Sequence, residues 1–181
     1  WQRFGSQFAS QIKNRRAGGM QSSNWKWHLD EVFVKIKVER HYLWRAVDHE
    51  GEVLESYVTK KRDKKAALKF MKKAMRRYGS PNEIVTDKLG SYGAAARDLG
   101  CPEKQVTKRW ANNRVENSHL PFRRRERAML RFRRMHSLQK FASIHASFHN
   151  LFNSQRSLSK RSIFKLNRDA ALTEWRSLVI A

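Results

Sequence analysis

The sequence predicts an α/β domain built on a mixed five-stranded sheet, with three antiparallel strands first and helices flanking it. Three observations support this. Apolar and polar residues alternate at 25–36, 41–48 and 53–59, which is typical of half-buried strands. The connections between these segments are so short that only antiparallel pairing is possible. Helical periodicity at 63–78 then separates them from a fourth apolar run at 82–87.

The composition indicates one domain with a polyanionic partner. The 181 residues suit a single domain with a real core. Lys and Arg exceed Asp and Glu by 39 to 16, and the net charge of +23 favours nucleic acid as a partner over an acidic membrane. No apolar run approaches the ~18 residues of a membrane helix and no signal peptide is recognisable, so we expect no membrane insertion. The single cysteine, Cys101, indicates a reducing cytoplasm, and we assign it no role.

Two further segments flank this domain. Apolar residues recur at helical spacing from Trp1 to Ile12, and a basic linker with a glycine pair follows them. Helical spacing returns around Leu172 and Trp175. The chain begins at Trp1 and not at a methionine, from which we expect that a segment upstream is missing. The expected units are an N-terminal helix and linker at 1–23, a central domain at 24–155 and a helical extension at 156–181.

Carboxylates interrupt the strand pattern. Asp30 and Glu31 lie side by side in the first strand, Asp87 ends the fourth, and Glu116 lies in a long basic helix expected after residue 111. Successive strand residues point to opposite faces, so we expect only one of Asp30 and Glu31 to face a cleft. Each acid could instead be solvated or pair with one of the many basic residues.

The order of the elements brings three of these acids together. Three antiparallel strands, a helix, a strand, a helix, a short strand and a long helix follow the order of the ribonuclease H-like fold. In that fold Asp30 would lie beside Asp87, and Glu116 would lean over both. Three convergent carboxylates repel one another unless cations lie between them. We expect two Mg²⁺ ions, for which Mn²⁺ can substitute, because Mg²⁺ prefers oxygen ligands and substrate phosphate.

Four motifs carry a family resemblance: WHLDEVFVKI, HYLWRAVDHEG, IVTDKLGSYGAA and NNRVENSHLPFRRRER. In order and wording they resemble the catalytic core of bacterial DDE transposases of the insertion sequence six family, over about 25–152. The resemblance implies Asp30, Asp87 and Glu116 as a metal-binding catalytic triad. It implies cleavage at transposon ends and transfer of the freed 3′-hydroxyl into target DNA. The partners it implies are terminal-repeat and target DNA, bound by a homodimer or larger assembly in the bacterial cytoplasm at the nucleoid.

Several details depart from the family pattern. Only the last helix of the family's N-terminal helix-turn-helix is recognisable, so we expect poor recognition of element ends. The gap between Asp87 and Glu116 is short, which indicates a trimmed loop. The first hairpin has Lys37 and Val38 where relatives have Asn-Gly, so we expect a looser turn. Pro121 should kink or restart the long helix.

Basic residues near the acids are expected to contact DNA. Arg123, seven positions after Glu116, matches a basic residue that such transposases place two helical turns on. Lys88 and Arg114 are adjacent to the triad acids in the sequence. The full set of expected DNA contacts is Lys88, Arg114, Arg123, Arg124 and Arg127.

Two other functions remain open. A non-catalytic or decayed DNA-binding protein would need only the positive charge. A ribonuclease H-like nuclease would use the same acids without joining DNA ends. Weaker candidate sites are the Glu-x-x-His pair Glu116 and His119 as half of a di-iron signature, the helical pair His145 and His149 as metal ligands, and Trp44 and Trp110 as base-stacking residues.

Overall fold

The computed structural model of the chain describes residues 5–17, 26–108, 112–129, 132–152 and 160–180. Trp1, Trp110 and the glycine pair of the linker therefore lie outside the described residues. Within the described part, no helix is both long enough and apolar enough to cross a bilayer.

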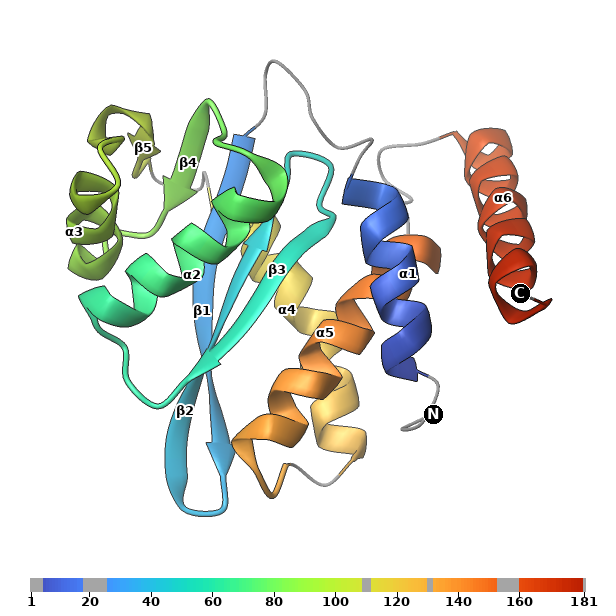
Figure 1. Cartoon of the computed structure of the whole chain (residues 1–181), viewed down its shortest axis with the longest axis horizontal. Coiled ribbons are helices and arrows are strands. Elements are labelled where there is room, and N and C mark those ends of the chain that lie inside the picture. Colours follow the sequence, from blue (N-terminus) through green and yellow to red (C-terminus); the bar gives the residue numbers. More distant parts are fainter. Residues whose placement is uncertain (1–4, 18–25, 109–111, 130–131, 153–159, 181) are drawn as a thin grey trace.

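Five strands form one mixed sheet in the order β3-β2-β1-β4-β5 (Figure 1). The first three pair antiparallel, whereas β4 pairs parallel with β1, and β5 pairs parallel with β4. Parallel pairing requires the crossover that the intervening helices supply. The predicted α/β class and five-stranded mixed sheet are confirmed. The strands are β1 (Lys26–Ile36), β2 (Glu39–Val47), β3 (Val53–Thr59), β4 (Glu83–Thr86) and β5 (Gln105–Val106).

Helices cover both faces of this sheet (Figure 1). On one face, α2 and α3 pack with Leu29 and Trp44 in the larger core cluster. On the other face, α4 and α5 pack with Val34 and Leu43. Adjacent residues of a strand therefore pack into the cores on opposite faces of the sheet, because side chains alternate along a strand. The helices are α1 (Gly5–Ala17), α2 (Lys64–Tyr78), α3 (Gly90–Asp98), α4 (Asn113–Ala128), α5 (Met135–Phe152) and α6 (Arg161–Ile180), with a short 3₁₀ turn at Pro102–Lys104.

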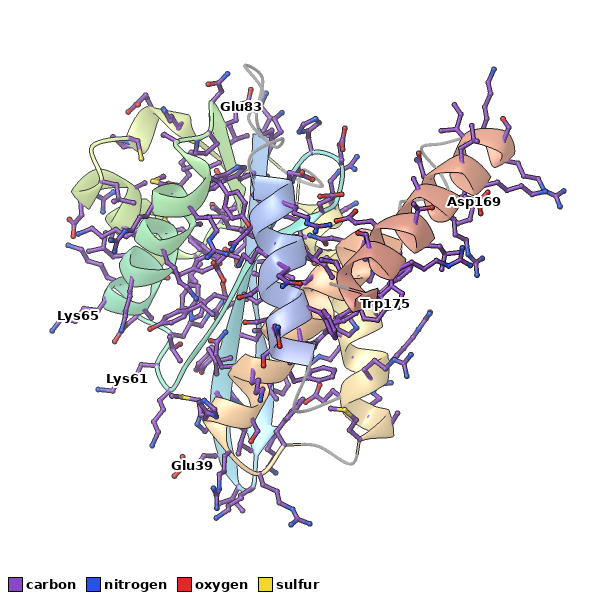
Figure 2. The ribbon with its side chains drawn as sticks, turned by 45° about the vertical axis from the view of Figure 1, so that its right-hand side comes forward. Glu39, Lys61, Lys65, Glu83, Asp169 and Trp175 are labelled. Atoms are coloured by element: carbon purple, nitrogen blue, oxygen red, sulfur yellow. The ribbon has the colours of Figure 1, made fainter. Side chains whose placement is uncertain are left out.

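The terminal helices pack together against α5. Trp175 lies on α6 (Figure 2). Its aromatic ring is edge-on to Phe8 of α1 at 5.3 Å and to Phe148 of α5 at 5.2 Å between centroids. Ile12 of α1 is fully buried in the same cluster. The helix expected around Leu172 is confirmed, although it starts earlier than the sequence pattern indicated.

Asp63 caps the N-terminus of α2. Its Oδ1 accepts a hydrogen bond from the backbone N–H of Ala66 at 2.8 Å. The Asp63→Ala variant should therefore lose about 1 kcal/mol of unfolding free energy, because a backbone donor loses its partner. Asp63→Asn should retain nearly all of it, since asparagine caps equally well. Urea denaturation of the two variants measures the difference, and equal losses would contradict this role.

Two turns connect the first three strands. In the turn between β2 and β3, Asp48 Oδ1 accepts hydrogen bonds from the N–H groups of Glu50 and Glu52 at 2.9 Å each. The looser turn expected at Lys37 and Val38 is wrong. Ile36 pairs directly with Glu39, which leaves a two-residue turn with Lys37 at φ 54°. Lysine pays a steric penalty there that the long β1–β2 ladder offsets.

Of the kink or restart expected at Pro121, the restart is wrong, because α4 runs without a break from Asn113 to Ala128, while the kink stays a prediction. Proline lacks the N–H that would bond one turn back. The helix is held nearby by other contacts. Arg45, fully buried on β2, donates to the carbonyl oxygen of Ser118 at 2.6 Å, and Phe122 is completely buried against the sheet. Packing on the sheet therefore outweighs the loss of one hydrogen bond within the helix.

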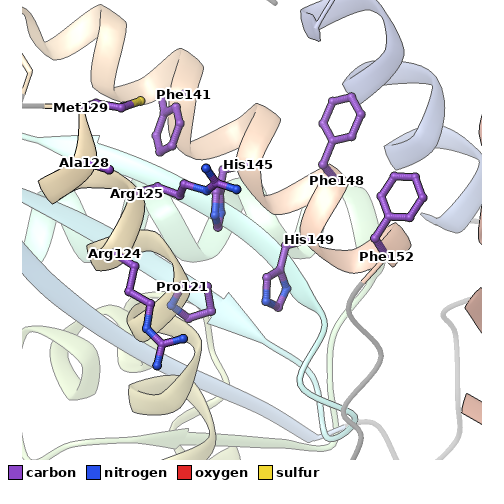
Figure 3. A pocket seen from close by; sticks show the side chains of 10 residues that line it. All are labelled: Pro121, Arg124, Arg125, Ala128, Met129, Phe141, His145, Phe148, His149 and Phe152. Carbon is purple, nitrogen blue, oxygen red and sulfur yellow. The ribbon is translucent and has the colours of Figure 1, made fainter.

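A groove of about 740 Å³ lies between α4 and α5 (Figure 3). Pro121 and Arg124 line it from α4, and His145 and His149 line it from α5. The two imidazole rings stack with centroids 5.9 Å apart, and both residues are partly buried. Burial, followed by the charges of Arg45, His149 and Arg125, lowers the pKa of His145 to about 4. The nearby guanidinium groups would repel a bound cation. His145 and His149 are therefore better explained as neutral, packed helix residues than as a cation site.

The low pKa of His145 predicts a loss of stability in acid. The unfolded chain takes up this proton near pH 6.5 and the folded chain only near pH 4. The contribution is therefore complete above about pH 6.5 and is lost as the pH falls towards 4, by on the order of 1–3 kcal/mol. His145→Gln should flatten the acid limb in urea denaturation. The exposed His136 on the same helix is the control, and an equal effect of His136→Gln would refute the assignment.

Candidate active site

Carboxylates converge where β1 passes the end of β4. The parallel ladder between these strands ends at the Leu29–Thr86 pair, so Asp30 is the next residue of β1 and Asp87 is the first residue after β4. One carboxylate oxygen each from Asp30, Glu31 and Asp87 lies within 4.8 Å of the other two. The structure thus brings together two of the three acids that the sequence suggested, and it adds Glu31.

The expectation that only one of Asp30 and Glu31 would face a cleft is wrong, because both carboxylates lie beside Asp87. Asp30 and Glu31 do point to opposite faces of β1: Asp30 contacts His119 of α4, and Glu31 accepts a hydrogen bond from the Tyr92 hydroxyl of α3 at 2.8 Å. Because β4 has ended, however, no strand separates the two side chains from Asp87. Both carboxylates therefore lie near Asp87, just past the C-terminal end of β4.

The environment of these acids disfavours negative charge. Burial raises the pKa of Glu31 to about 7, against the opposing effects of the Tyr92 hydrogen bond and the Arg62 guanidinium. Burial also raises the pKa of Asp87, partly offset by the hydrogen bond from the Leu89 N–H, and Asp30 adds like-charge repulsion. Such a cluster is stabilised by any cation that enters it.

One face of α4 lies along β1, beside this cluster of carboxylates. Asn112 donates to the Leu29 carbonyl oxygen at 2.9 Å, and His119 bonds Asp30 Oδ2 at 3.1 Å. Arg123 donates to the Phe33 carbonyl oxygen at 2.5 Å. These residues are spaced by seven and four positions, so they share one helical face.

Glu116 belongs to the same face, four positions after Asn112 and three before His119. It lies in the first turn of α4, and its side chain is exposed. Its carboxylate is not among the oxygens that lie within 4.8 Å of one another. The fold therefore places Glu116 on the helix face that borders the site, while its role as the third acid stays a prediction.

The expected DNA-contacting residues occupy different environments. Lys88, directly after Asp87, is exposed, and so are Arg124 and Arg127 on α4. Arg114 is half-buried. Arg123 bonds Glu126 at 2.6 Å in addition to Phe33, so part of its hydrogen-bonding capacity is committed within the protein.

Sequence reasoning missed two residues at the site and misjudged a third. Arg62, in the loop before α2, forms an ion pair with Glu31, and its Nη2 lies 3.7 Å from Asp87 Oδ2. Tyr92 was within a quoted motif but was given no role, although it follows Asp87 by five residues. His119 was considered only beside Glu116, yet it binds Asp30.

Comparison with known families identifies the domain. The family model DDE_Tnp_IS240, described as a DDE domain, matches residues 24–155. The chain belongs to the DDE transposase family. Its place within the insertion sequence six group rests on the same model and on curated relatives.

Transposases from Staphylococcus aureus are similar to this DDE domain in sequence. The transposase of insertion sequence-like element IS431mec from strain Mu50 is 34% identical over 100 residues, covering 52% of this chain and 45% of the relative. The transposase of IS257 in transposon Tn4003 matches with the same values. The chain therefore spans about half the length of the curated relatives it matches.

A solved structure confirms the fold of the DDE domain. The HTLV-2 integrase catalytic core domain, solved in complex with magnesium, aligns with a TM-score of 0.53 and 19% identity. The alignment covers 77% of this chain and 90% of the integrase chain. The ribonuclease H-like arrangement expected from the element order is confirmed by this likeness.

The donor set of the DDE domain fits a hard divalent cation. Asp30 and Asp87 offer carboxylate oxygens, which Mg²⁺ and Mn²⁺ accept as ligands, whereas the Glu31 carboxylate beside them is bonded to Arg62 and Tyr92. Burial raises the pKa of Glu31 and of Asp87, and a cation beside these carboxylates would favour their charged forms.

Proposed function

We propose that this chain is the catalytic domain of a transposase that cuts DNA at the ends of a mobile element and joins the freed 3′-hydroxyl to target DNA. The observation that carries the proposal is the convergence of Asp30 and Asp87 at the C-terminal end of β4. Membership of the DDE family supports the same function. Asp30, Asp87 and Glu116 would form the catalytic set.

These acids would hold two Mg²⁺ ions, or Mn²⁺ in their place. When bound, such ions neutralise charge at the reacting phosphate and orient the attacking and leaving oxygens. The protein's own contribution is to hold the carboxylates. Asp30 lies on β1 and Asp87 directly follows the adjacent strand β4, and Glu116 would complete the set from the α4 face that already contacts β1.

His119 would orient Asp30. Burial lowers the pKa of His119, against the raising effect of the Asp30 hydrogen bond, so the ring is neutral at physiological pH. A neutral ring that bonds a carboxylate through Nε2 must carry its proton there. His119 therefore donates to Oδ2 of Asp30 and fixes that carboxylate without supplying a second positive charge.

The positive charge would bind the substrate DNA. A net charge of +23 attracts phosphate over long range, and Lys88, directly after Asp87, and Arg124 and Arg127 on α4 are exposed and would contact the DNA backbone. Arg114 and Arg123 would contribute from the same helix. The DNA would comprise terminal repeats and target, held by a homodimer or larger assembly on paired ends at the bacterial nucleoid.

A strand-transfer assay tests the proposal. The chain is incubated with a labelled DNA duplex that has a pre-cut 3′-hydroxyl end and with a plasmid target, in Mg²⁺, in Mn²⁺ or in EDTA. We expect joined products with either ion and none in EDTA. Cleavage without joining would instead indicate a nuclease. Salt-sensitive binding with neither reaction would indicate a non-catalytic DNA-binding protein.

A further inference from the structure

We propose that Arg62 is a phosphate-binding residue of the active site, held in place by Glu31 and Tyr92. The inference rests on the proposed DNA-joining function and assigns that site a substrate contact from outside the acidic set. Arg62 would bind a backbone phosphate of the DNA strand beside the reacting one. Glu31 and Tyr92 would act through Arg62 as positioning residues.

The anchor of Arg62 is unusually well buried. The Glu31 side chain is only 2% exposed and accepts a hydrogen bond from the hydroxyl of Tyr92 at 2.8 Å. Tyr92 is completely buried and lies edge-on to the Trp44 ring, with centroids 5.5 Å apart. The hydrophobic core on the α2–α3 side of the sheet therefore holds the Glu31 carboxylate, the ion-pair partner of Arg62, in place.

Arg62 itself is only half-enclosed. Its side chain is 41% exposed, and one nitrogen, Nη2, reaches both the buried Glu31 and the exposed Asp87. Among the described residues, these two acids are its ion-pair partners. A guanidinium has five N–H donors in a planar fork, so Nη1 and Nε remain for a further oxyanion.

The placement of Arg62 suits a phosphate that lies on the acids. The guanidinium lies beside Glu31 and Asp87, past the C-terminal end of β4, on a side chain that is partly open to solvent. Simple neutralisation of Glu31 would need only a single buried point charge. A planar, partly exposed fork supports bidentate binding of phosphate instead.

Three single variants test the contact. Arg62→Ala should lower kcat/KM for joining of pre-cut ends by about ten- to a hundredfold, the typical loss for one hydrogen bond to a charged group. Arg62→Lys should recover only part of this, since a point charge lacks the fork. Lys61→Ala removes the same charge one residue earlier, from a side chain that points away from the body (Figure 2), and should have little effect. Equal losses for Lys61→Ala and Arg62→Ala would overturn the proposal.

A double variant separates phosphate binding from neutralisation of Glu31. Arg62→Ala alone leaves Glu31 buried and unpaired, which also destabilises the fold. Glu31→Gln combined with Arg62→Ala removes that problem, so urea denaturation should show restored stability. If Arg62 binds phosphate, the double variant stays as inactive as Arg62→Ala. Recovery of joining activity would show that Arg62 only neutralises Glu31 and would overturn the proposal.

Ion binding provides a readout without DNA. In Mn²⁺ titrations followed by electron paramagnetic resonance, Glu31→Gln should bind Mn²⁺ about as tightly as the unmodified chain. A tenfold or greater loss would make Glu31 an ion ligand and overturn its positioning role. Failure of the proposed function looks different, because the unmodified chain would then join no ends under any condition.

Discussion

Asp87→Asn is expected to reduce DNA joining by at least about a thousandfold while DNA affinity stays within about twofold. Asparagine is nearly isosteric but neutral, so it removes one of the two converging strand carboxylates without disturbing β4. Loss of a single stabilising donor at a reacting centre already reduces rates by about a hundred- to a thousandfold, and an ion ligand should contribute more. Single-turnover joining assays and fluorescence anisotropy with the same DNA measure the two quantities.

A second acid in the same domain provides the matched control. Asp98 on α3 pairs with Lys64 at 2.9 Å on the surface, and its side chain is 38% exposed. Asp98→Asn makes the same chemical change away from the site, and a surface ion pair contributes little. We expect nearly unchanged joining. An active Asp87→Asn variant would exclude the proposed chemistry at this position.

The strands and the two strand acids could be predicted because their signals are local. Alternating apolar residues define β1 and β2, and the parallel pairing of β1 with β4 follows from the intervening helix. Asp30 and Asp87 then meet because both lie at the same level of neighbouring strands. Glu116 could be assigned to a helix, yet its position relative to the strand acids depends on how α4 packs.

The Glu31–Arg62–Tyr92 group could not be predicted, because its members come from three separate elements. Strand alternation correctly places Glu31 on the opposite face from Asp30. It does not reveal that the end of β4 leaves both side chains free to approach Asp87. Among more than thirty basic residues, nothing local distinguishes Arg62.

The errors at Lys37 and Pro121 share one cause, which is that tertiary structure overrode local preference. A long antiparallel ladder imposes a tight turn on Lys37. Burial of Phe122 next to Pro121 keeps α4 continuous. In contrast, the spacing of Asn112, His119 and Arg123 was visible in the sequence and could have indicated a helix face along β1.

Trp44→Ala should lower the free energy of unfolding by about 3–5 kcal/mol. The Trp44 side chain is completely buried, and its indole N–H donates to Thr59 Oγ1 at 2.8 Å. Its ring also supports Tyr92, so its removal loosens the anchor of Glu31. Urea denaturation measures the loss, and a change below about 1 kcal/mol would contradict this role.

Trp44→Phe separates packing from base recognition. Phenylalanine keeps an aromatic ring against Tyr92 but loses the hydrogen bond to Thr59, so we expect a smaller loss of about 1–2 kcal/mol. A ring with no exposed surface cannot stack on a DNA base. Affinity for single-stranded DNA should therefore match that of the unmodified chain in anisotropy titrations. A drop of about tenfold, as stacking on one base would produce, would instead require Trp44 to leave the core when DNA binds.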